Sequence, residues 1–346
     1  MKQSFFNIDF PAEWEPQSGI MLSWPHPDTD WKDMLNEVIP CFKAIAKEIL
    51  KREKLLIVCS CISDVKMALE CEDDARIIFR EIPSNDTWAR DHGPVSVFVN
   101  GEPFLLDFMF NGWGLKFPAD RDNQITRRLY ENGVFSPQTS YKSMLHVVLE
   151  GGSIETDGAG TILTTSKCLL SVNRNEYKSK AEISDYLQWI LGAKHVLWLD
   201  KGYLAGDDTD SHIDMLARFC NSKTIAYVQC TDENDEHYSE LLQMEEELRK
   251  FKSLDGEPYQ LLPLPMAEAV YFEGERLPAS YANFLIINEA VLLPFYDSPL
   301  DEIARQQLQK AFPDREIIGI NCLPLIRQHG SLHCCTMQLP KNFLKE

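Results

Sequence analysis

Short hydrophobic runs recur along the whole chain and are separated by longer amphipathic stretches. The runs are rich in β-branched and aromatic residues and are bounded by turn-forming residues, which is typical of β-strands. This pattern predicts strands at 19–24, 54–60, 75–80, 95–99, 144–149, 195–199, 223–228, 283–288, 290–294 and 316–320. Stretches whose apolar positions follow the helical period predict helices at 33–52, 122–131, 179–191, 239–251 and 299–312. Ser298 as N-cap and Pro299 at the first helical position favour the start of the last helix.

The order of these elements is regular. Two strands, a helix and a further strand recur at roughly even spacing, and about five such units would fill the 346 residues. Identity between the units is too low to establish a repeat, so the spacing leaves an ordinary α/β or α+β sheet protein equally open. No low-complexity segment or long flexible linker divides the chain. We therefore expect an α/β protein whose residues 1–346 form a single domain.

The net charge of the chain limits the kinds of binding partner that we expect. Lys and Arg number 34 and Asp and Glu number 53, which gives a net charge of −19. Nucleic acids and anionic membranes attract basic surfaces, so neither is an expected partner. An acidic protein suits a small cationic ligand, although acidity also serves solubility alone. No run approaches the ~18–20 apolar residues of a membrane span, and the N-terminus is too polar for a signal peptide, so we expect a cytoplasmic protein.

Ten cysteines are expected to be thiols in that compartment. No C-x-x-C pair is present, which argues against structural zinc and against thioredoxin-like chemistry. We expect most of them to be small buried residues, with one as a candidate nucleophile.

Residues 85–94 (NDTWARDHGP) form the first segment with unusual polar density. Asp86 and Asp91 could grip a cation while Trp88 lies against its flat face. The alternative is an acidic loop with a salt bridge to Arg90.

A second segment, 149–154 (LEGGSI), places two glycines after Glu150. Gly151 and Gly152 permit a positive φ and a close backbone approach. The third glycine of a phosphate-binding loop is missing, so nucleotide binding is not expected, and a plain hairpin turn is the alternative.

The third segment, 206–214 (GDDTDSHID), clusters carboxylates around a histidine. If its second half is a strand, His212 and Asp214 share a face, with Asp210 two residues earlier. Clustered carboxylates repel one another and normally await a cation, which could be a metal held by a D-x-H-x-D set or an organic guanidinium. A solvated acidic turn is the alternative.

The fourth segment, 329–336 (HGSLHCCT), brings Gly330 before two adjacent thiols. On a strand, Cys334 and Cys335 would point to opposite faces, so only one could enter a given site. Both could instead simply be buried.

Together these parts suit a guanidinium substrate. Asp91 and Asp214 would grip its N–H groups, Cys334 would attack its carbon, and His212 would protonate the departing ammonia and then activate water. Nearby carboxylates raise the pKa of a thiol and a bound guanidinium lowers it. We therefore expect Cys334 to ionise mainly when substrate arrives.

At this point the chain resembles the agmatine deiminases and the bacterial-type peptidylarginine deiminases. The resemblance rests on these four motifs, on NRN at 173–175 and on the opening EWEPQSGIMLSWPH, in matching order from about residue 8 to residue 340. It implies the pentein fold, an α/β propeller of five β-β-α-β modules around a central active site. It also implies hydrolysis of a guanidine without metal or cofactor, through a covalent cysteine (thiouronium) intermediate.

The resemblance assigns roles to individual residues: nucleophile Cys334, acid/base His212, guanidinium-binding Asp91 and Asp214, and contacts to the substrate chain and distal amine from Trp88 and Asp208. We add three further candidate substrate-binding residues: Asp86, Glu150 and Gly330. The chain departs from the usual family pattern at His92, His329, Ser331 and Cys335.

Agmatine is the expected substrate, giving N-carbamoylputrescine and ammonia as in putrescine biosynthesis from arginine. The peptidylarginine branch commonly carries a secretion signal and extra domains, and we expect neither for this chain, so peptidyl-arginine deimination is the alternative. More remote are a manganese-dependent ureohydrolase, for which no second ligand cluster is found, and a non-catalytic pentein binding protein, against which the Cys/His/Asp set argues. The sequence leaves a homo-oligomer open.

Overall fold

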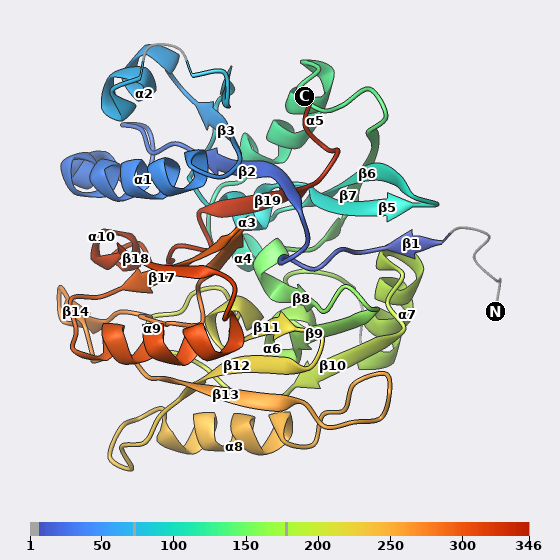
Figure 1. Ribbon diagram of the computed structural model, residues 1–346, viewed down its shortest axis with the longest axis vertical. Coiled ribbons are helices and arrows are strands. Elements are labelled where there is room, and N and C mark those ends of the chain that lie inside the picture. The colour runs from blue at the N-terminus through green and yellow to red at the C-terminus, as the bar shows by residue number, and fades with distance from the viewer. Residues whose placement is uncertain (1–6, 72–73, 177–178, 346) are drawn as a thin grey trace.

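The strands of the protein form several small mixed sheets, and helices pack against them (Figure 1). The computed structural model describes residues 7–71, 74–176 and 179–345. Within these ranges, five units share one topology: two antiparallel strands, a helix, and a strand parallel to the second. The succession of two strands, a helix and a strand that the hydrophobic spacing predicted is therefore present.

The five units contain the following elements: β19 (Thr336–Pro340), β2 (Gln17–Ser23), α1 (Leu35–Leu50) and β3 (Lys54–Cys59); β5 (Val95–Val99), β6 (Glu102–Met109), α5 (Ile125–Glu131) and β7 (Ser140–Val148); β8 (Ile154–Thr156), β9 (Thr161–Thr165), α7 (Lys180–Leu191) and β10 (His195–Leu199); β11 (Ala217–Asn221), β12 (Thr224–Gln229), α8 (Tyr238–Leu248) and β13 (Gln260–Pro265); β16 (Leu285–Ile287), β17 (Ala290–Phe295), α9 (Leu300–Ala311) and β18 (Glu316–Asn321).

Shorter elements complete the described chain. The strands are β1 (Ile8–Asp9) beside β5, β4 (Ile77–Glu81) beside β3, and the hairpin of β14 (Tyr271–Phe272) and β15 (Glu275–Arg276). The helices are α2 (Ile62–Leu69), α3 (Ala89–His92), α4 (Gly112–Leu115), α6 (Ser166–Leu169) and α10 (Leu323–Ile326), with 3₁₀ turns η1 (Lys32–Met34), η2 (Asp122–Gln124), η3 (Gly151–Ser153) and η4 (Ile213–Met215).

All ten strands expected from the hydrophobic runs are present, with ends that differ by a few residues. The structure also contains further strands that the runs did not predict, and some of these, such as β9, are rich in polar residues. Every residue of β9 is buried although three of its five residues are threonines. The hydroxyl of Thr164 donates to the Ser153 carbonyl at 2.7 Å, and that of Thr165 donates to the Ser211 carbonyl at 2.8 Å. Because these hydroxyls are satisfied inside the protein, the strand is buried without a hydrophobic signal.

The five expected helices are also present, and the start of α9 differs by one residue. The helix begins at Leu300 rather than Pro299, and Pro299 is its N-cap. The Ser298 hydroxyl still accepts a hydrogen bond from the Leu300 N–H at 3.2 Å. Ser298 therefore caps the helix as expected, although it lies one residue before the N-cap position.

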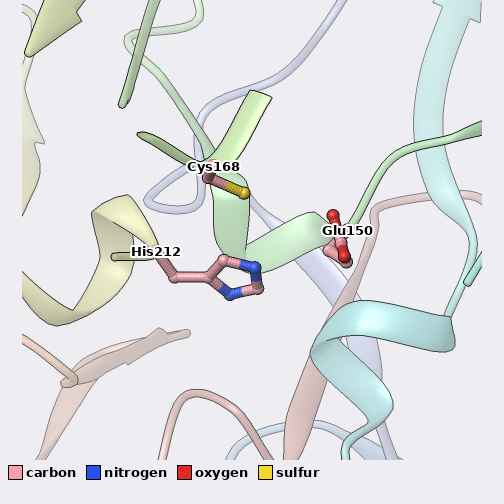
Figure 2. A group of neighbouring side chains, drawn as sticks. All are labelled: Glu150, Cys168 and His212. Atoms are coloured by element: carbon pink, nitrogen blue, oxygen red, sulfur yellow. The ribbon is translucent and has the colours of Figure 1, made fainter. Parts of the chain in front are cut away.

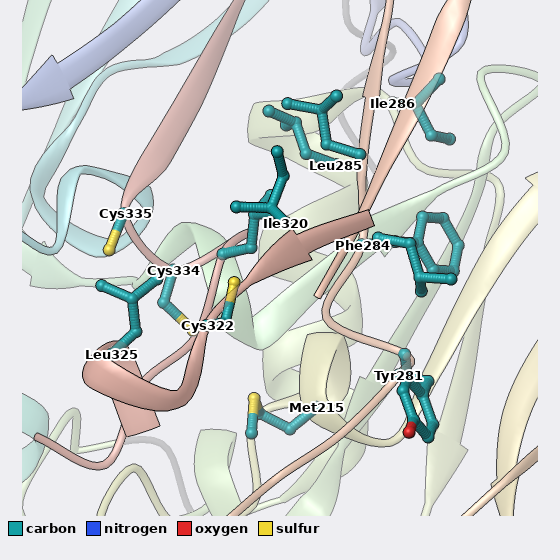
Figure 3. Packing of buried hydrophobic residues seen from close by; sticks show 14 of the residues in the cluster. Met215, Tyr281, Phe284, Leu285, Ile286, Ile320, Cys322, Leu325, Cys334 and Cys335 are labelled. Carbon is teal, nitrogen blue, oxygen red and sulfur yellow. The ribbon is translucent and has the colours of Figure 1, made fainter. Parts of the chain in front are cut away.

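The two ends of the chain meet in one sheet, where β19 runs antiparallel beside β2 (Figure 1). Cys334 and Cys335 directly precede β19, so this pairing places them beside the unit that contains β2. Figure 3 shows both cysteines among buried side chains that include Cys322 and Leu325. Eight of the ten cysteines are buried and no disulfide joins them, which confirms the reading of buried thiols.

Short turns rather than long elements bring the polar motifs together. Helix α3 contacts η3, and η3 contacts η4. These three turns carry residues of the first three polar motifs, and the segment before β19 carries the fourth. A membrane-crossing helix is not found in the described part of the chain.

Candidate active site

Three of the expected catalytic side chains converge on Gly152. A Cβ atom placed on this glycine would lie 2.6 Å from His212 Nδ1, 2.8 Å from Asp91 Oδ1 and 3.1 Å from Asp214 Oδ2. The glycine is therefore needed for space. Neither Gly151 nor Gly152 uses the positive φ that glycine permits, and the turn η3 stands in place of the hairpin alternative.

Asp91, on α3, is held rigidly in this cluster. Its Oδ2 accepts from the Trp113 indole N–H at 2.9 Å, and its Oδ1 accepts from the Gly152 N–H at 2.9 Å. Oδ1 also lies 3.7 Å from His212 Nδ1. Burial raises the pKa of Asp91 and outweighs the lowering by His212. Trp113 was missed in the sequence because nothing near it marks it as a partner of Asp91.

Asp214 lies in η4, so the condition of a strand through His212 and Asp214 is not met. The two residues converge on Gly152 through a 3₁₀ turn instead. Oδ2 of Asp214 lies 2.8 Å from His333 Nδ1, whereas Oδ1 is buried with no hydrogen-bond partner in the part of the chain described. Burial raises the pKa of Asp214, but the hydrogen bond and charge of His333 outweigh burial and the pKa is lowered. An ionised carboxylate with one bare oxygen is ready to accept from a cationic donor.

The Cys334 thiol lies beside this carboxylate. Its Sγ is 4.0 Å from Asp214 Oδ2 and contacts the side-chain amide of Asn283, at 3.3 Å from Nδ2 and 3.5 Å from Oδ1. Burial, with Asp214 and Asp91, raises the pKa of Cys334 well above its ordinary value. Cys335 has different surroundings, beside Cys41 and close to the motif that contains Asp86.

His212 adjoins a second buried group, shown in Figure 2. This group consists of Glu150, Cys168 and His212. A carboxylate oxygen, the sulfur and a ring nitrogen of these residues all lie within 4.8 Å of one another. Both oxygens of Glu150 accept from the Nε–H of Arg174, at 2.9 and 3.0 Å. The carboxylate is thereby balanced by a guanidinium.

The imidazole of His212 is favoured in its charged form. Burial lowers the pKa of His212, but Asp91, Cys168 and Glu150 outweigh burial and hold the pKa well above its ordinary value. Its Nδ1 lies 3.7 Å from Asp91 Oδ1 and faces Gly152, where the carboxylates converge. A buried imidazolium whose N–H faces these carboxylates is suited to give a proton to a leaving group.

Arg174 was named only within the NRN motif, and the structure gives it a definite place. Its NH1 donates to Asp210 Oδ2 at 2.6 Å and its NH2 donates to the Thr209 carbonyl at 2.7 Å. Asp210 also pairs with Lys116. Because Asp210 is engaged in this way, and only Glu150, Cys168 and His212 group as metal-type ligands in the described residues, the D-x-H-x-D metal set is not formed.

Of the candidate substrate contacts, Trp88, Gly330 and Asp86 lie together, and Asp208 lies apart from them in sequence. The Trp88 ring packs onto Gly330, where a Cβ atom would lie 2.2 Å from the ring. Asp86 accepts from the indole N–H groups of Trp88, at 3.1 Å, and of Trp31, at 3.0 Å. Asp86 thus holds two tryptophans in place. The alternative salt bridge of Arg90 with its own acidic loop is not found, since Arg90 pairs with Glu13 at 3.5 Å.

Asp208 is half-buried, and its surroundings are mixed in charge. Burial raises the pKa of Asp208 to about 6, with His329 and Lys116 lowering it and Asp207 raising it. The Lys116 ammonium contacts the Asp208 carbonyl, and the carboxylate itself has no hydrogen-bond donor from another side chain in the described residues. It is therefore available to a ligand.

A buried chain of charges lies behind Asp214. His333 Nε2 is 2.8 Å from Glu13 Oε2, and Glu13 Oε2 accepts from Arg218 NH2 at 3.0 Å. Arg218 in turn pairs with Glu155 at 2.5 Å. Sequence reasoning missed Glu13, Arg218 and Glu155.

Comparison with known proteins places this geometry in context. Residues 9–340 match the family described as Porphyromonas-type peptidyl-arginine deiminase. Agmatine deiminase of Pseudomonas aeruginosa is 32% identical over 95% of both chains. A solved Porphyromonas gingivalis structure, provisionally named arginine deiminase, is 54% identical, with 98% and 100% coverage of the two chains and a TM-score of 0.94. A cysteine-to-serine variant of C. jejuni agmatine deiminase with substrate bound is 39% identical, with 100% and 99% coverage and a TM-score of 0.92.

Proposed function

The chain belongs to the Porphyromonas-type peptidyl-arginine deiminase family, and on that premise we propose that it hydrolyses agmatine to N-carbamoylputrescine and ammonia. The observation that carries this proposal is the convergence of a thiol, an imidazole and two carboxylates in one buried site. Relatives named agmatine deiminase, one of them with substrate bound, support it. The direct test is to assay ureido product and ammonia from agmatine, free arginine and an arginyl peptide side by side.

Binding is the first step of the proposed mechanism. The substrate guanidinium donates to the bare Oδ1 of Asp214 and to the remaining lone pairs of Asp91. Trp113, Gly152 and His333 hold these carboxylates and so fix the plane of the guanidinium. The sulfur of Cys334, 4.0 Å from Asp214 Oδ2, then faces the electrophilic carbon.

The Cys334 thiol first loses its proton to solvent, and attack by the resulting thiolate forms a carbon–sulfur bond. The carbon–nitrogen bond to the departing group breaks, and the His212 imidazolium supplies the proton with which that group leaves as ammonia. The product of this half-reaction is a thiouronium on Cys334 and a neutral His212.

Water completes the reaction. Neutral His212 takes one proton as the water oxygen attacks, the carbon–sulfur bond breaks, and the second proton returns the sulfur to its thiol form. The ureido product leaves, and His212 is again an imidazolium.

Ionisation of the thiol is tied to substrate in this scheme, and this can be tested. In a His212→Gln background, where agmatine persists, the pKa of Cys334 should fall when agmatine binds, because the guanidinium offsets Asp91 and Asp214. Ultraviolet thiolate absorbance against pH, with a Cys334→Ser protein as blank, measures this shift. A pKa that is equal with and without agmatine would contradict substrate-assisted ionisation.

We propose that Trp88 contacts the substrate's methylene chain and that Asp208 receives the distal ammonium. Asp208→Asn should raise KM for agmatine about 10–100-fold, the value of a lost charged hydrogen bond. Butylguanidine, which lacks the ammonium, serves as the matched substrate and should lose little. Equal losses on both substrates would remove Asp208 from this role.

Glu150 and Asp86 act indirectly in this proposal. Glu150 sets the charge around His212 and Asp86 orients Trp88, while Gly330 provides the space that Trp88 fills. We also propose that the five strand units surround the site about a pseudo-fivefold axis, as in the pentein fold, within one domain.

Arginine deimination is the second candidate. The P. gingivalis relative at 54% identity is named for arginine rather than agmatine. Free arginine carries a carboxylate beside its distal ammonium, which the acidic Asp207 and Asp208 would repel. Product from arginine or an arginyl peptide at a higher kcat/KM than from agmatine would favour this candidate.

A further inference from the structure

Asn283 is the polar side chain that touches the sulfur of Cys334 from outside the four sequence motifs. It is fully buried in the segment before β16. Its Nδ2 lies 3.3 Å from Cys334 Sγ and 3.4 Å from the Asp214 carbonyl. The amide therefore meets both the reacting atom and the backbone of a guanidinium-binding residue.

The surrounding backbone fixes which end of the amide faces the sulfur. Oδ1 of Asn283 accepts from the His333 N–H at 2.8 Å and from the Cys334 N–H at 3.4 Å. These N–H groups require an oxygen, because a second donor would leave them unpaired in a buried site. Nδ2 must then point its two hydrogens toward the Asp214 carbonyl and the sulfur.

The segment that carries Asn283 is itself pinned. Its Ser280 hydroxyl donates to the Met215 carbonyl at 2.7 Å, directly after Asp214. The Tyr296 hydroxyl donates to the Ser280 carbonyl at 2.9 Å and also lies 2.9 Å from the Ser331 hydroxyl. The amide is thus linked on one side to η4 and on the other to the motif that contains Cys334.

We propose that Asn283 is a catalytic residue whose side-chain N–H stabilises the thiolate of Cys334. When the sulfur is protonated, the thiol can donate to Oδ1 of Asn283 at 3.5 Å. When the thiol loses its proton to solvent, Nδ2 donates to the anionic sulfur, and a hydrogen bond to a charged acceptor is the stronger kind. The same amide serves both protonation states without moving.

This donor answers a specific electrostatic problem. Asp214 and Asp91 are needed to hold a cation, yet they disfavour a second anion beside them. In the described site no lysine or arginine side chain donates to the sulfur. A neutral N–H can stabilise the thiolate without competing with the guanidinium for the two carboxylates.

Two substitutions separate this role from a structural one. Asn283→Asp keeps an acceptor for the His333 and Cys334 N–H groups and removes the donor, whereas Asn283→Ala removes the donor without adding charge. Asn321→Asp, at the exposed end of β18, is the control for an added carboxylate. The readout is the alkylation rate of Cys334 by iodoacetamide at neutral to mildly alkaline pH, located by peptide mass spectrometry.

Both Asn283 variants should alkylate about 10–100-fold more slowly at fixed pH, because their thiolate fraction is smaller by that factor. In both, kcat should recover as pH rises, while KM for agmatine changes little. Asn321→Asp should behave as the parent protein. Alkylation at the parent rate in either variant that folds, judged by an unchanged melting temperature, would overturn the proposal, as would an activity loss that higher pH does not restore.

The inference rests on the proposed function only for the predictions about kcat and KM with agmatine. Alkylation is measured on the protein without substrate, so it tests the Asn283 donor even if agmatine is not the substrate. Slow alkylation in the variants together with no product from agmatine in the parent protein would leave Asn283 in place and refute the substrate.

Discussion

Replacing Cys334 by serine should abolish product formation from agmatine, with a loss of at least about 10³-fold, whereas Cys335→Ser should retain most activity. A serine hydroxyl is far less acidic than a thiol and cannot supply the same nucleophile. The two neighbouring cysteines make a matched pair, because only Cys334 lies against Asp214 and Asn283. Cys335 lies beside Cys41 instead.

The measurement is ureido product from agmatine, with and without EDTA, for the parent protein and both variants. We expect the parent protein and Cys335→Ser to be active in EDTA. Product from Cys334→Ser at more than a few per cent of the parent rate would remove Cys334 as nucleophile. Activity that disappears in EDTA would instead revive metal-dependent hydrolysis.

The architecture was predictable where hydrophobic burial governs it. Strand β5 and strand β10 begin and end where the hydrophobic runs place them, because each run has turn formers on both sides. Strand β9 was not predictable, since its threonines look polar and the hydroxyls of Thr164 and Thr165 are satisfied only by partners from other segments. The pairing of β19 with β2 is likewise a long-range contact that no local pattern encodes.

The site was predictable to the extent that its chemistry lies in local motifs. Cys334, His212, Asp91 and Asp214 each stand in a dense polar segment, and the structure brings these segments together. Their local backbone was not predictable: Asp214 lies in the 3₁₀ turn η4, which ends just before β11. In a strand, the alternation of side chains would also have placed Asp214 on the same face as His212, but with an extended backbone.

The supporting residues were missed because their partners are distant in sequence. Glu13 and His333 are 320 positions apart, and Asn283 is 51 positions from Cys334. Glu13 opens the EWEPQSGIMLSWPH segment, and Asn283 stands in an apolar segment, but neither segment shows which distant side chain its residue contacts. Their roles follow only when the fold brings the chain ends and β16 to one place.

Replacing His212 by glutamine should lower kcat for agmatine by about 10²–10⁴-fold, the usual contribution of a general acid/base. Glutamine keeps a donor of similar length but cannot transfer a proton. The raised pKa of His212, due to Asp91, Cys168 and Glu150 against burial, favours the charged form of the parent imidazole. The proton that the departing ammonia needs is therefore present before attack.

Intact-protein mass spectrometry after quenching tells which half-reaction has failed. If His212 protonates the departing ammonia, the His212→Gln protein should carry no thiouronium on Cys334. An accumulated adduct would restrict His212 to activating water. His195→Gln, on β10, is the control for loss of an imidazole, and Cys168→Ser tests whether the neighbouring thiol matters. A His212→Gln protein with kcat within a few-fold of the parent would exclude His212 from both steps, since the imidazole whose Nδ1 faces Gly152 and Asp91 would then transfer no proton.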